Sequence, residues 1–580
     1  MIKKTKSRQE YFELSNFRRR FMILILLILF ATLFSRAFYL QSMQKEFLQS
    51  KGGDISNRNE KLHAFRGKIL DRNNELLAAS SPVETVWANP SDVIMNKSQK
   101  NRLALLLKMR KDHLDERLDK KDTNHVYLRR QIAPELAGKI MALKIPGIYS
   151  EKNYRRYYPG KEAMAHVVGF TNVDGDGIEG IELQSNKFLS GEHGFRKVLK
   201  NRKGNVVDDL QDIQIPVDGK DVILSVDKRL QYASYKALEK AVEKHAALSG
   251  SAVLIDAKTG EVLAMSNYPS FNPNTSRSSQ RSEYIKNRVV TDIFEPGSTL
   301  KPLTVSAALK NNSVTPDTLI DTAKGFYRVG KRLTVRDTHA NGIITVKEIV
   351  QKSSNIGTTH IVEGLQAKYL WSILNDFGLG AKTGIEYPGE VTGKVHHYKE
   401  WGEIERATIS YGYGISSTLI QLAQAYTVFA NEGVIKPITL FKEEGIIIGK
   451  RVVDKKTSNE MLAILESVVT EGTAPYAQVN GYRVAGKTGT AKKPNPNGGG
   501  YGKNYIGSFV GMAPVSNPRF ILAVMIDEPT IDGYYGGVVA APVFSTIMSE
   551  ALKLYSIPQD GIEFDAPKEQ KMVYLNKYDE

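Results

Sequence analysis

The sequence predicts an α+β protein with a single N-terminal membrane helix, an elongated N-terminal module and a C-terminal domain whose central antiparallel sheet is flanked by helices. Three observations lead to this fold class. A basic segment precedes a long apolar run at the N-terminus, a charge-rich region with short strand-like runs follows, and the last part of the chain begins with two strand-like segments and ends with three. Because helical patterning fills the interval between these strands, both ends of the domain must contribute to the sheet.

The composition excludes several classes of protein. The 580 residues are 41% hydrophobic and 24% charged, which supports a packed core and about two to four domains. A formal net charge of +16 favours anionic surroundings such as nucleic acid, anionic lipid or an acidic polymer. The chain has no cysteine, so thiolate zinc sites, iron–sulfur clusters, disulfides and a cysteine nucleophile are excluded.

The N-terminus is predicted to be a membrane anchor. Residues 1–20 carry seven Lys and Arg against two Glu, and residues 21–40 are almost entirely apolar. A helix of this length spans a hydrocarbon layer of about 30 Å, and Arg36 is close enough to its far end to reach the interface. The positive-inside rule places the N-terminus in the cytoplasm and the rest of the chain outside, which removes nucleic acid as a partner. A cleaved signal peptide is the alternative, but no small-residue cleavage site follows the run.

Changes in composition divide the rest of the chain. Polar residues follow the anchor, a charge-rich α+β module comes next, regular strand and helix patterning begins near Asp221, and a polar tail ends the chain. The predicted parts are a cytoplasmic tail (1–20), an anchor (21–40), a juxtamembrane helix and linker (41–60), the N-terminal module (61–220), the C-terminal domain (221–560) and a polar tail (561–580).

The pattern of the C-terminal domain predicts its elements in order. Apolar residues at helical spacing indicate a helix over 229–246, and a Lys-Thr-Gly turn joins two strands within 251–267. The region 295–480 is predicted to be mostly helical. The remaining predicted elements are an early strand at 222–226, late strands at 482–493, 504–513 and 520–528, a long flexible loop at 494–502 and a final amphipathic helix at 541–555 that can cover the sheet.

The first motif that could carry out chemistry is the S-x-x-K of Ser298 and Lys301. Positions i and i+3 share one face of a helix, so the amine can reach the hydroxyl, and a desolvated, cation-rich site can keep that amine partly neutral. Since Pro302 is tolerated only near the first turn of a helix, the helix must begin close to Ser298, at the positive end of its dipole. The same spacing at Ser225 and Lys228 is interpreted as a surface coincidence, and a plain Ser cap is the structural alternative for Ser298 itself.

The second motif is the S-x-N of Ser353 and Asn355. A hydroxyl and an amide two residues apart could relay a proton and hold a substrate carbonyl. Taken alone the motif is weak, because Ser270 and Asn272 have the same spacing. A loop in which the side chain caps a helix is the structural alternative.

The third motif comprises Lys487, Thr488, Gly489 and Thr490 on a predicted strand. A cation with neighbouring hydroxyls can bind a substrate carboxylate, and the glycine lets a ligand approach the backbone closely. The copy at 258–260 is better explained as a plain hairpin turn.

The three motifs together carry more information than any one of them. An S-x-x-K, an S-x-N and a K-T-G in this order are the signature of penicillin-binding proteins and serine β-lactamases. RGKILDRN (66–73), RRYYPGKEAMAHVVGF (155–170), GIEGIE (177–182) and FRKVLKNRKGNVV (195–207) resemble the N-terminal module of class B penicillin-binding proteins. NRVVTDIFEPGSTLKP (287–302), SYGYGISSTLIQLAQAY (410–426) and YYGGVVAAPVFSTIM (534–548) resemble the division-specific branch, the septal peptidoglycan D,D-transpeptidases of the FtsI type. Asn74 stands where the family often has Gly, and Asn also tolerates a left-handed turn.

The resemblance implies a fold and a mechanism. The N-terminal module would be the dimerisation or pedestal module, and the C-terminal domain a penicillin-binding, serine β-lactamase-like transpeptidase domain. Ser298 would attack the penultimate D-Ala carbonyl of a pentapeptide stem while Lys301 takes its proton. D-Ala would leave protonated through Ser353, with Lys487 tuning this relay and Asn355 holding the peptide.

The resemblance also implies how the substrate is bound. Backbone N–H groups of Ser298 and Thr490 would form an oxyanion hole, and Lys487, Thr488 and Thr490 would bind the terminal carboxylate beside Gly489. An amine from a neighbouring stem would then resolve the acyl-enzyme and close a cross-link, and β-lactams would acylate the same serine. No cofactor and no metal are expected, since no HExxH or comparable ligand spacing occurs among the ten His.

Partners and location follow from the same resemblance. The expected substrates are peptidoglycan pentapeptide stems on glycan derived from lipid-linked precursors. The expected protein partners are the polytopic septal glycosyltransferase and other divisome membrane proteins. The expected location is the inner membrane at the division septum, with a single pass, a cytoplasmic N-terminus and a periplasmic catalytic domain.

Two other functions are compatible with the same three motifs. A D,D-carboxypeptidase or β-lactamase would let water resolve the acyl-enzyme, but such hydrolases do not need the extra module of about 160 residues or the anchor. A divisome scaffold would use the module and anchor to bind partners, with catalysis secondary.

Overall fold

The computed structural model describes residues 15–48, 57–120, 122–200, 206–275, 281–445, 447–495 and 498–561. The chain divides into two compact units, Met1–Ala64 with Glu192–Val217, and Phe65–Gly191 with Asp218–Glu580. Apart from residue 561, the predicted C-terminal tail lies outside the described residues. Residues 1–14 of the predicted basic tail also lie outside them.

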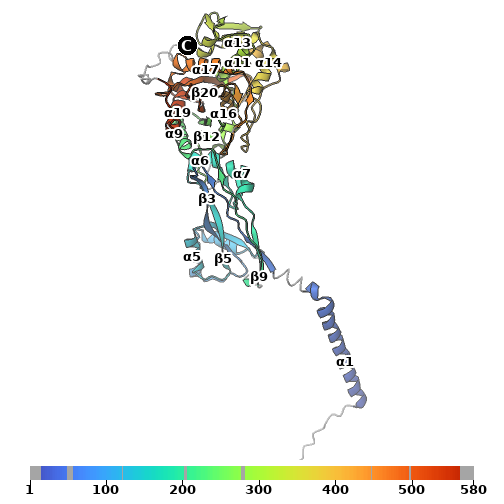
Figure 1. The fold of residues 1–580 in the computed structure, drawn as a ribbon. Helices are drawn as coiled ribbons and strands as arrows, with labels where there is room; N and C mark the ends of the chain where they lie inside the picture. Colours follow the sequence, from blue (N-terminus) through green and yellow to red (C-terminus); the bar gives the residue numbers. More distant parts are fainter. Residues whose placement is uncertain are drawn as a thin grey trace, which may run out of the picture. The chain divides into compact units, whose positions relative to one another are not determined.

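The first unit contains the long apolar helix, made of α1 (Asn16–Phe38) and a π-helical turn (Tyr39–Met43) (Figure 1). The most apolar 18-residue stretch of Asn16–Met43 has a mean hydropathy of 2.4, and none of it is buried inside the protein. An apolar helix with every side chain exposed is stable where lipid covers it. The helix therefore fits the predicted single-pass anchor.

A three-stranded antiparallel sheet completes the first unit. It consists of β1 (Asn57–Leu62), β8 (Gly194–Lys200) and β9 (Val206–Gln214) in the order β1-β8-β9. Residues 57–60, predicted to be linker, instead begin β1, since Asn57 pairs with Leu199 and Glu60 with Arg196. The partner strand lies far along the sequence, so local composition could not reveal this pairing.

A small lobe of the second unit contains the outer part of the N-terminal module. Its helices are α3 (Lys97–Leu106), α4 (Lys111–Leu118) and α5 (Pro134–Met141), and its core includes Leu103, Leu114 and Leu128. The sheet beside these helices takes the order β10-β2-β3-β4, with β5 also paired to β3. Its strands are β2 (Ile69–Leu70), β3 (Leu76–Ala88), β4 (Val126–Ile132), β5 (Ile148–Tyr157) and β10 (Val222–Ile223).

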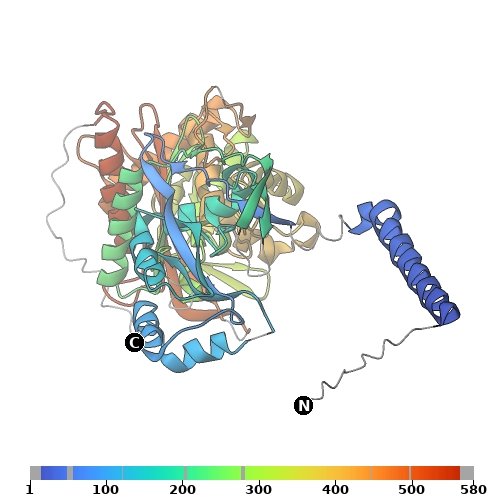
Figure 2. The ribbon, with the colours of Figure 1, turned by 90° about the horizontal axis from the view of Figure 1, so that it is seen from below.

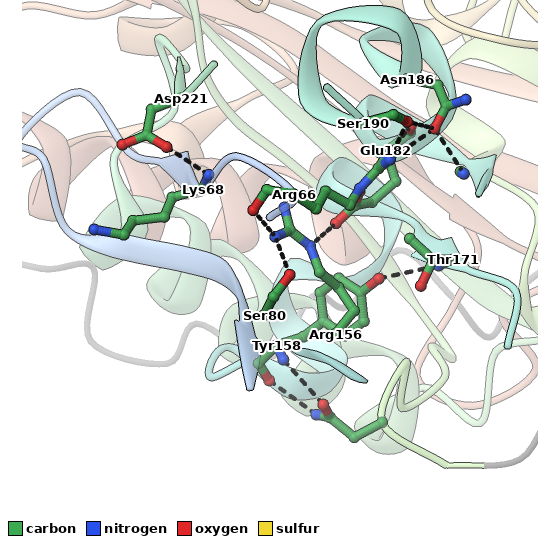
Figure 3. A network of polar contacts seen from close by, with 12 residues as sticks. Arg66, Lys68, Ser80, Arg156, Tyr158, Thr171, Glu182, Asn186, Ser190 and Asp221 are labelled. Carbon is green, nitrogen blue, oxygen red and sulfur yellow. Dashed lines mark hydrogen bonds and ion pairs between the residues drawn. The ribbon is translucent and has the colours of Figure 1, made fainter. Parts of the chain in front are cut away.

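A buried ion cluster joins three of the segments on which the family resemblance rests (Figure 3). Glu182 is fully buried and accepts hydrogen bonds from Arg66 Nε at 2.7 Å and from Arg156 Nε at 2.6 Å. Arg66 Nη1 also donates to Asn186 and to Ser190, each at 2.8 Å. Because a buried charge without its partners is costly, each member of the cluster depends on the others.

Short elements surround this cluster and connect it to the C-terminal domain. Asn74 has a φ of 63°, so Asn does occupy a left-handed turn there, as predicted. The short elements are α6 (Lys161–Val168), β6 (Phe170–Thr171), β7 (Gly177–Glu179), α7 (Gly180–Gln184) and α8 (Asn186–Leu189).

The C-terminal domain is built on a five-stranded antiparallel sheet in the order β12-β11-β21-β20-β19. Two early strands and three late strands make up the sheet, which confirms the predicted topology. The strands are β11 (Ser249–Asp256), β12 (Val262–Tyr268), β19 (Ala485–Pro494), β20 (Tyr501–Ala513) and β21 (Phe520–Asp527).

Helices cover both faces of this sheet (Figure 1). On one face, α9 (Lys228–Lys244) and α19 (Ala541–Leu554) lie side by side (Figure 2). On the other face lies α16 (Leu419–Ala430), in which every residue is buried. The segment Gly536–Leu554 is also apolar enough to span a membrane, but more than half of it is buried within the domain, where it covers the sheet as predicted.

The middle of the domain is helical, as predicted, but it also contains short strands. These strands form two-stranded sheets, and each strand is too short to show an alternating apolar pattern in the sequence. Between β12 and β19 the further helices are α10 (Arg288–Thr291), α11 (Lys301–Lys310), α12 (Val346–Gln351), α13 (Asn355–Glu363), α14 (Ala367–Asp376), α15 (Glu403–Ser410) and α17 (Lys455–Thr470), and the strands are β13 (Leu319–Asp321), β14 (Phe326–Val329), β15 (Leu333–Arg336), β16 (Ile343–Thr345), β17 (Val434–Ile435) and β18 (Lys450–Arg451). A last short helix, α18 (Gly536–Val539), lies directly before α19.

Two further predictions are corrected near residue 225. The predicted strand at 222–226 is limited to β10, because the chain then turns into the N-terminal cap of α9 at Asp227. Ser225 is not a surface residue, since it is fully buried and its hydroxyl donates to Val262 O at 2.8 Å. Ser225 therefore has a structural role, and its S-x-x-K spacing to Lys228 does not mark a reactive site.

Candidate active site

Ser298 lies in a tight turn at the start of α11. Residues Gly297–Leu300 form a 3-10 turn that continues directly into α11, so the helix begins near Ser298, as predicted, although its first turn is 3-10. The turn is fixed on two sides, because Gly297 N donates to Gly412 O at 3.1 Å and Tyr426 OH donates to Thr299 O at 2.8 Å. A Cβ at position 412 would lie 2.1 Å from Gly297 O, so only glycine allows this contact.

Ser353 stands between the Ser298 hydroxyl and the Lys301 amine. Its Oγ donates to Ser298 Oγ at 2.9 Å, and Lys301 Nζ donates to the same Oγ at 3.2 Å and to Ser353 O. Among the described residues, Lys301 Nζ makes no direct hydrogen bond to Ser298 Oγ. The amine thus communicates with Ser298 through Ser353.

Lys487 approaches the same hydroxyl from β19. Its Nζ donates to Ser353 Oγ at 3.2 Å and to the carbonyl and hydroxyl of Thr488, each at 3.2 Å. Both lysine side chains are fully buried. The S-x-x-K, S-x-N and K-T-G motifs therefore meet at one point, the Ser353 hydroxyl.

The electrostatics of the site favour neutral amines. Burial lowers the pKa of Lys487 to about 7. Burial, and then the charge of Lys487, lower the pKa of Lys301 well below its ordinary value, while the carboxylate of Asp337 opposes this shift. Near neutral pH the site can hold an amine that accepts a proton.

Asp337 is a site residue that the sequence analysis did not find. Its Oδ1 accepts the backbone N–H groups of Asn355 at 2.6 Å and Ile356 at 3.1 Å, and its Oδ2 accepts the Ser354 hydroxyl. Ser354 in turn caps α13, since its Oγ accepts Gly357 N at 2.9 Å. Asp337 thereby holds the loop that carries the second motif, and no local spacing links it to that motif.

Ser353 and Asn355 point in different directions from this loop. Ser353 has a φ of 63°, a left-handed conformation that is rare outside glycine and Asn. The amide Nδ2 of Asn355 donates to Arg336 O at 2.9 Å, while its Oδ1 has no hydrogen-bond partner among the described residues. That oxygen can accept an N–H from a peptide.

The K-T-G segment lies on β19, the edge strand of the sheet. The Thr488 hydroxyl is nearly buried and bonds to Thr473 Oγ1 at 2.9 Å as well as to Lys487, so it supports that amine. The half-buried Thr490 accepts Gly536 N at its hydroxyl at 3.1 Å. Thr473 was not found in the sequence, because an isolated Thr gives no signal.

Gly489 is close to the chain itself. A Cβ at this position would lie 2.3 Å from Ser508 Oγ and 2.9 Å from Thr299 Cγ2. The sequence interpretation gave this space to a ligand, whereas the structure fills it with β20 and the Ser298 turn. The glycine therefore lets β19 approach the turn that carries Ser298.

The rim of the site is tied to the loop between β19 and β20. Glu295 Oε1 accepts Gly414 N at 2.7 Å and Tyr501 OH at 3.1 Å, and burial raises the pKa of Glu295. Tyr413 OH accepts Lys492 N at 3.2 Å. Part of the predicted flexible loop, residues 496–497, lies outside the described residues.

The site offers no evident metal ligands. In the described part of the chain, no three His, Asp or Glu side chains cluster in a way that could hold a metal ion. Its chemistry is instead that of a serine hydroxyl hydrogen-bonded to a second serine between two buried lysines. Such an arrangement is typical of an active-site serine enzyme that works through an acyl intermediate.

Two family descriptions match the chain. Residues 250–549 match the penicillin binding protein transpeptidase domain, and residues 61–224 match the penicillin-binding protein dimerisation domain. The chain therefore belongs to the penicillin-binding transpeptidase family. The predicted family, fold class and type of enzyme are confirmed.

Individual relatives agree with this family. The chain is 39% identical to the probable peptidoglycan D,D-transpeptidase PenA of Neisseria gonorrhoeae, over 94% of each chain. It is 38% identical to the peptidoglycan D,D-transpeptidase FtsI of Escherichia coli, over 96% of this chain and 95% of the relative.

Solved structures agree as well. Penicillin binding protein 3 of Mycobacterium tuberculosis, solved in complex with aztreonam, aligns with a TM-score of 0.68 at 28% identity, over 87% of this chain and all of the other. The apo transpeptidase domain of penicillin-binding protein 3 from Burkholderia pseudomallei aligns with a TM-score of 0.54 at 44% identity, over 58% of this chain and 98% of the other.

Proposed function

We propose that this chain cross-links peptidoglycan stem peptides by D,D-transpeptidation during septal wall synthesis, through an acyl-enzyme on Ser298. The observation that carries the proposal is the Ser298–Ser353 hydrogen bond between two fully buried lysines. The relatives named peptidoglycan D,D-transpeptidases support the reaction and the substrate class.

In the first step, Ser298 Oγ attacks the penultimate D-Ala carbonyl of a pentapeptide stem. Lys301 accepts the Ser298 proton by way of the Ser353 hydroxyl, which lies within hydrogen-bond distance of both. Backbone N–H groups of Ser298 and Thr490 stabilise the oxyanion, and each such donor contributes on the order of 10²–10³ in rate.

In the second half of the first step, the terminal D-Ala leaves as a neutral amine. Its proton comes back through Ser353, with Lys487 adjusting the acidity of that hydroxyl from its 3.2 Å contact. Asn355 accepts a peptide N–H, and the Lys487, Thr488 and Thr490 region beside Gly489 binds the terminal carboxylate. An amine of a second stem then attacks the ester and releases Ser298, which forms the cross-link.

The substrate's surroundings follow the same assignment. The acyl donor is a pentapeptide stem on glycan made from lipid-linked precursors, and β-lactams such as aztreonam, bound by the Mycobacterium tuberculosis relative, acylate Ser298 in its place. The N-terminal module (61–220) and the anchor (21–40) bind the polytopic septal glycosyltransferase and other divisome membrane proteins. The basic residues before the apolar helix orient the N-terminus to the cytoplasm and the catalytic domain (221–560) to the periplasm.

The nucleophile is tested with a fluorescent penicillin on the full chain in detergent. Ser298→Ala should abolish covalent labelling. The matched control is Ser306→Ala on the same helix, because the buried Ser306 hydroxyl has no hydrogen-bond partner among the described residues and its loss should leave labelling unchanged. Labelling that survives in Ser298→Ala would falsify the assignment.

The reaction type is tested with donor and acceptor stem peptides. The transpeptidase should release D-Ala in step with the formation of a cross-linked dimer. D-Ala release without dimer would identify a carboxypeptidase, in which water replaces the amine.

A further inference from the structure

A basic groove lies in the small lobe, away from the serine site. It has a volume of about 590 Å³ and is lined by cationic side chains from the turn after α3, from α4 and from β4. We define the basic groove by Lys108, Arg110, His113, Arg117, Arg129 and Arg130. It shares no residue with the cluster around Ser298.

The charge of the groove is not balanced within the protein. No Asp or Glu lines it. Of its five Lys and Arg side chains, within the described residues only Arg130 forms an ion pair, with Asp174 at 2.5 Å, and Asp174 is 62% exposed. The surrounding segment 97–130 has eleven Lys and Arg against five Asp and Glu, a net of +6 within the +16 of the whole chain. An anionic ligand would relieve this repulsion.

Backbone contacts hold the guanidinium groups in place. Arg117 Nη1 donates to Tyr127 O and to Leu128 O at 3.0 Å, and Arg129 Nη1 donates to Leu107 O. Each of these arginines retains N–H groups with no partner among the described residues. The buried Nε of Arg130 also lacks a partner there. Donors that are fixed before a ligand arrives lose little conformational entropy on binding.

An aromatic row supports one side of the groove. Trp87 on β3 lies directly opposite Tyr127 on β4 and Tyr149 on β5, so the three residues form a row across the sheet. Trp87 stacks on Tyr149 with ring centroids 4.6 Å apart, and the Arg130 guanidinium lies 4.8 Å above the Tyr127 ring. His125 stacks on Trp87 with ring centroids 4.3 Å apart and packs edge-on against Tyr127 at 4.7 Å, and Tyr127 holds Arg130 by the cation–π contact.

We propose that the basic groove binds a phosphate-bearing ligand. Guanidinium forks match phosphate oxygens in bidentate geometry, and a phosphate or diphosphate places two or more charges in a small volume, which a single carboxylate does not. The volume is that of a small-molecule site and exceeds what one monatomic ion needs. The same chemistry occurs in free phosphate compounds and in phospholipid headgroups, to which a membrane-anchored chain has access.

The test uses the full chain in a non-ionic detergent and isothermal titration with inorganic pyrophosphate. One molecule should bind per chain, and binding should weaken as salt rises. Arg110→Gln with Arg130→Gln should weaken binding by about tenfold or more, since each variant removes a charge-assisted hydrogen bond. Lys97→Gln with Lys139→Gln is the matched control, because both lysines are exposed in the same lobe, lie outside the groove and carry the same total charge.

Three results decide the proposal. Absence of binding of both pyrophosphate and dihexanoyl phosphatidylglycerol, equal weakening in the matched control, or citrate binding as tight as that of the phosphate probe would each overturn it. Dihexanoyl phosphatidylglycerol, used below its micelle concentration, separates the sources: binding of this lipid alone identifies a headgroup site, and binding of both probes identifies a site for phosphate itself.

Loss of penicillin labelling would reveal a variant that fails to fold. A second measurement therefore tests the groove without any substitution. In the unaltered chain, pyrophosphate should slow amide hydrogen exchange in residues 107–117 and 127–130. Protection elsewhere and not in these segments would contradict the groove as the binding site.

Discussion

At the scale of single residues, the site depends on one hydroxyl that serves two amines. Ser353 Oγ lies 2.9 Å from Ser298 Oγ and 3.2 Å from the Nζ atoms of Lys301 and Lys487. Two buried ammonium groups so close would repel each other, so the folded protein favours the state in which at least one amine is neutral. The proposed nucleophile Ser298 would therefore acquire its reactivity from the other two motifs.

Acylation of Ser298 should depend on pH with a midpoint near 7. Burial lowers the pKa of Lys487 to about 7, and burial, followed by the charge of Lys487, lowers the pKa of Lys301 well below its ordinary value. Below the midpoint a proton binds to the pair and the base is lost, so the acylation rate should fall by about tenfold per pH unit. Stopped-flow acylation by a chromogenic cephalosporin between pH 5 and 9 measures this. Lys487→Arg, which stays charged, should be slow at every pH, and a flat profile of the unaltered chain would sink the idea.

At the scale of elements, the site lies where a 3-10 turn, a helix N-terminus and an edge strand meet. The turn at Gly297–Leu300, the start of α13 and the edge strand β19 each bring one motif. Close approach holds these elements at fixed distances, since a Cβ at position 412 would meet the backbone of Gly297 and a Cβ at position 489 would meet the side chains of Ser508 and Thr299. A shift of any one element would separate the Ser353 hydroxyl from its partners.

Asp337→Asn should loosen the start of α13. An amide cannot replace a carboxylate that accepts two backbone N–H groups and a hydroxyl, so the free energy of unfolding should fall by roughly 1–3 kcal/mol. Loss of this charge removes an effect that raises the pKa of Lys301, so the midpoint of the acylation profile should also move to lower pH. Urea unfolding and the cephalosporin assay measure the two effects. Asp321→Asn is the control, because Asp321 also caps a backbone N–H, at Ala323. An unchanged midpoint would assign Asp337 a purely structural role.

The elements also show what the sequence could and could not predict. The five strands of the central sheet, α9 and α19 followed from periodicity and from order along the chain, and the meeting of the three motifs followed from the family resemblance. The link from Lys301 to Ser298 through Ser353 did not, because spacing within one helix says nothing about a side chain from another element. Asp337 and Thr473 were missed for the same reason, and the short strands β13 to β18 were too brief to leave a period.

Glu182→Gln tests the ion cluster that joins three sequence motifs in the N-terminal module. Gln keeps the size of Glu but leaves Arg66 and Arg156 as buried charges without an anion, so stability should fall by roughly 3–5 kcal/mol. The urea midpoint of the full chain measures the loss, with the exposed Glu135→Gln as control. An equal midpoint for both variants would mean that the cluster adds no stability. Penicillin labelling of the folded variant should be unchanged.

At the scale of the second compact unit, the N-terminal module and the transpeptidase domain share a buried contact. His166 on α6 bonds through Nε2 to Tyr284 O at 2.8 Å and packs edge-on against Phe271, both of which belong to the transpeptidase domain. Tyr387 OH donates to His166 O from the same domain. The imidazole is neutral in this setting, since burial lowers its pKa to about 4.

This contact should weaken in acid. The unfolded chain binds a proton at His166 with its ordinary pKa of 6.5, and the folded chain does so only near 4, so stability falls as the pH drops from about 6.5 to 4. The loss amounts to about 3 kcal/mol at most. His166→Gln retains an N–H donor without a titrating group, so urea midpoints at pH 7 and pH 4.5 should differ less in this variant. Equal pH sensitivity of both proteins would contradict the role of His166.

The contacts made by Gly412 and Gly489 limit how this enzyme can evolve under antibiotics. A Cβ at position 412 would meet the backbone of Gly297, and a Cβ at position 489 would meet Ser508 Oγ and Thr299 Cγ2, so neither position can take a larger residue without moving its neighbours around Ser298. Variants that escape an acylating inhibitor and still build wall should therefore change the rim, where Glu295, Tyr413 and Tyr501 hold the loop beside β19 through side-chain contacts. Resistance in this protein should therefore arise from substitutions in the rim that slow binding of the drug, while Ser298, Lys301 and Lys487 remain unchanged.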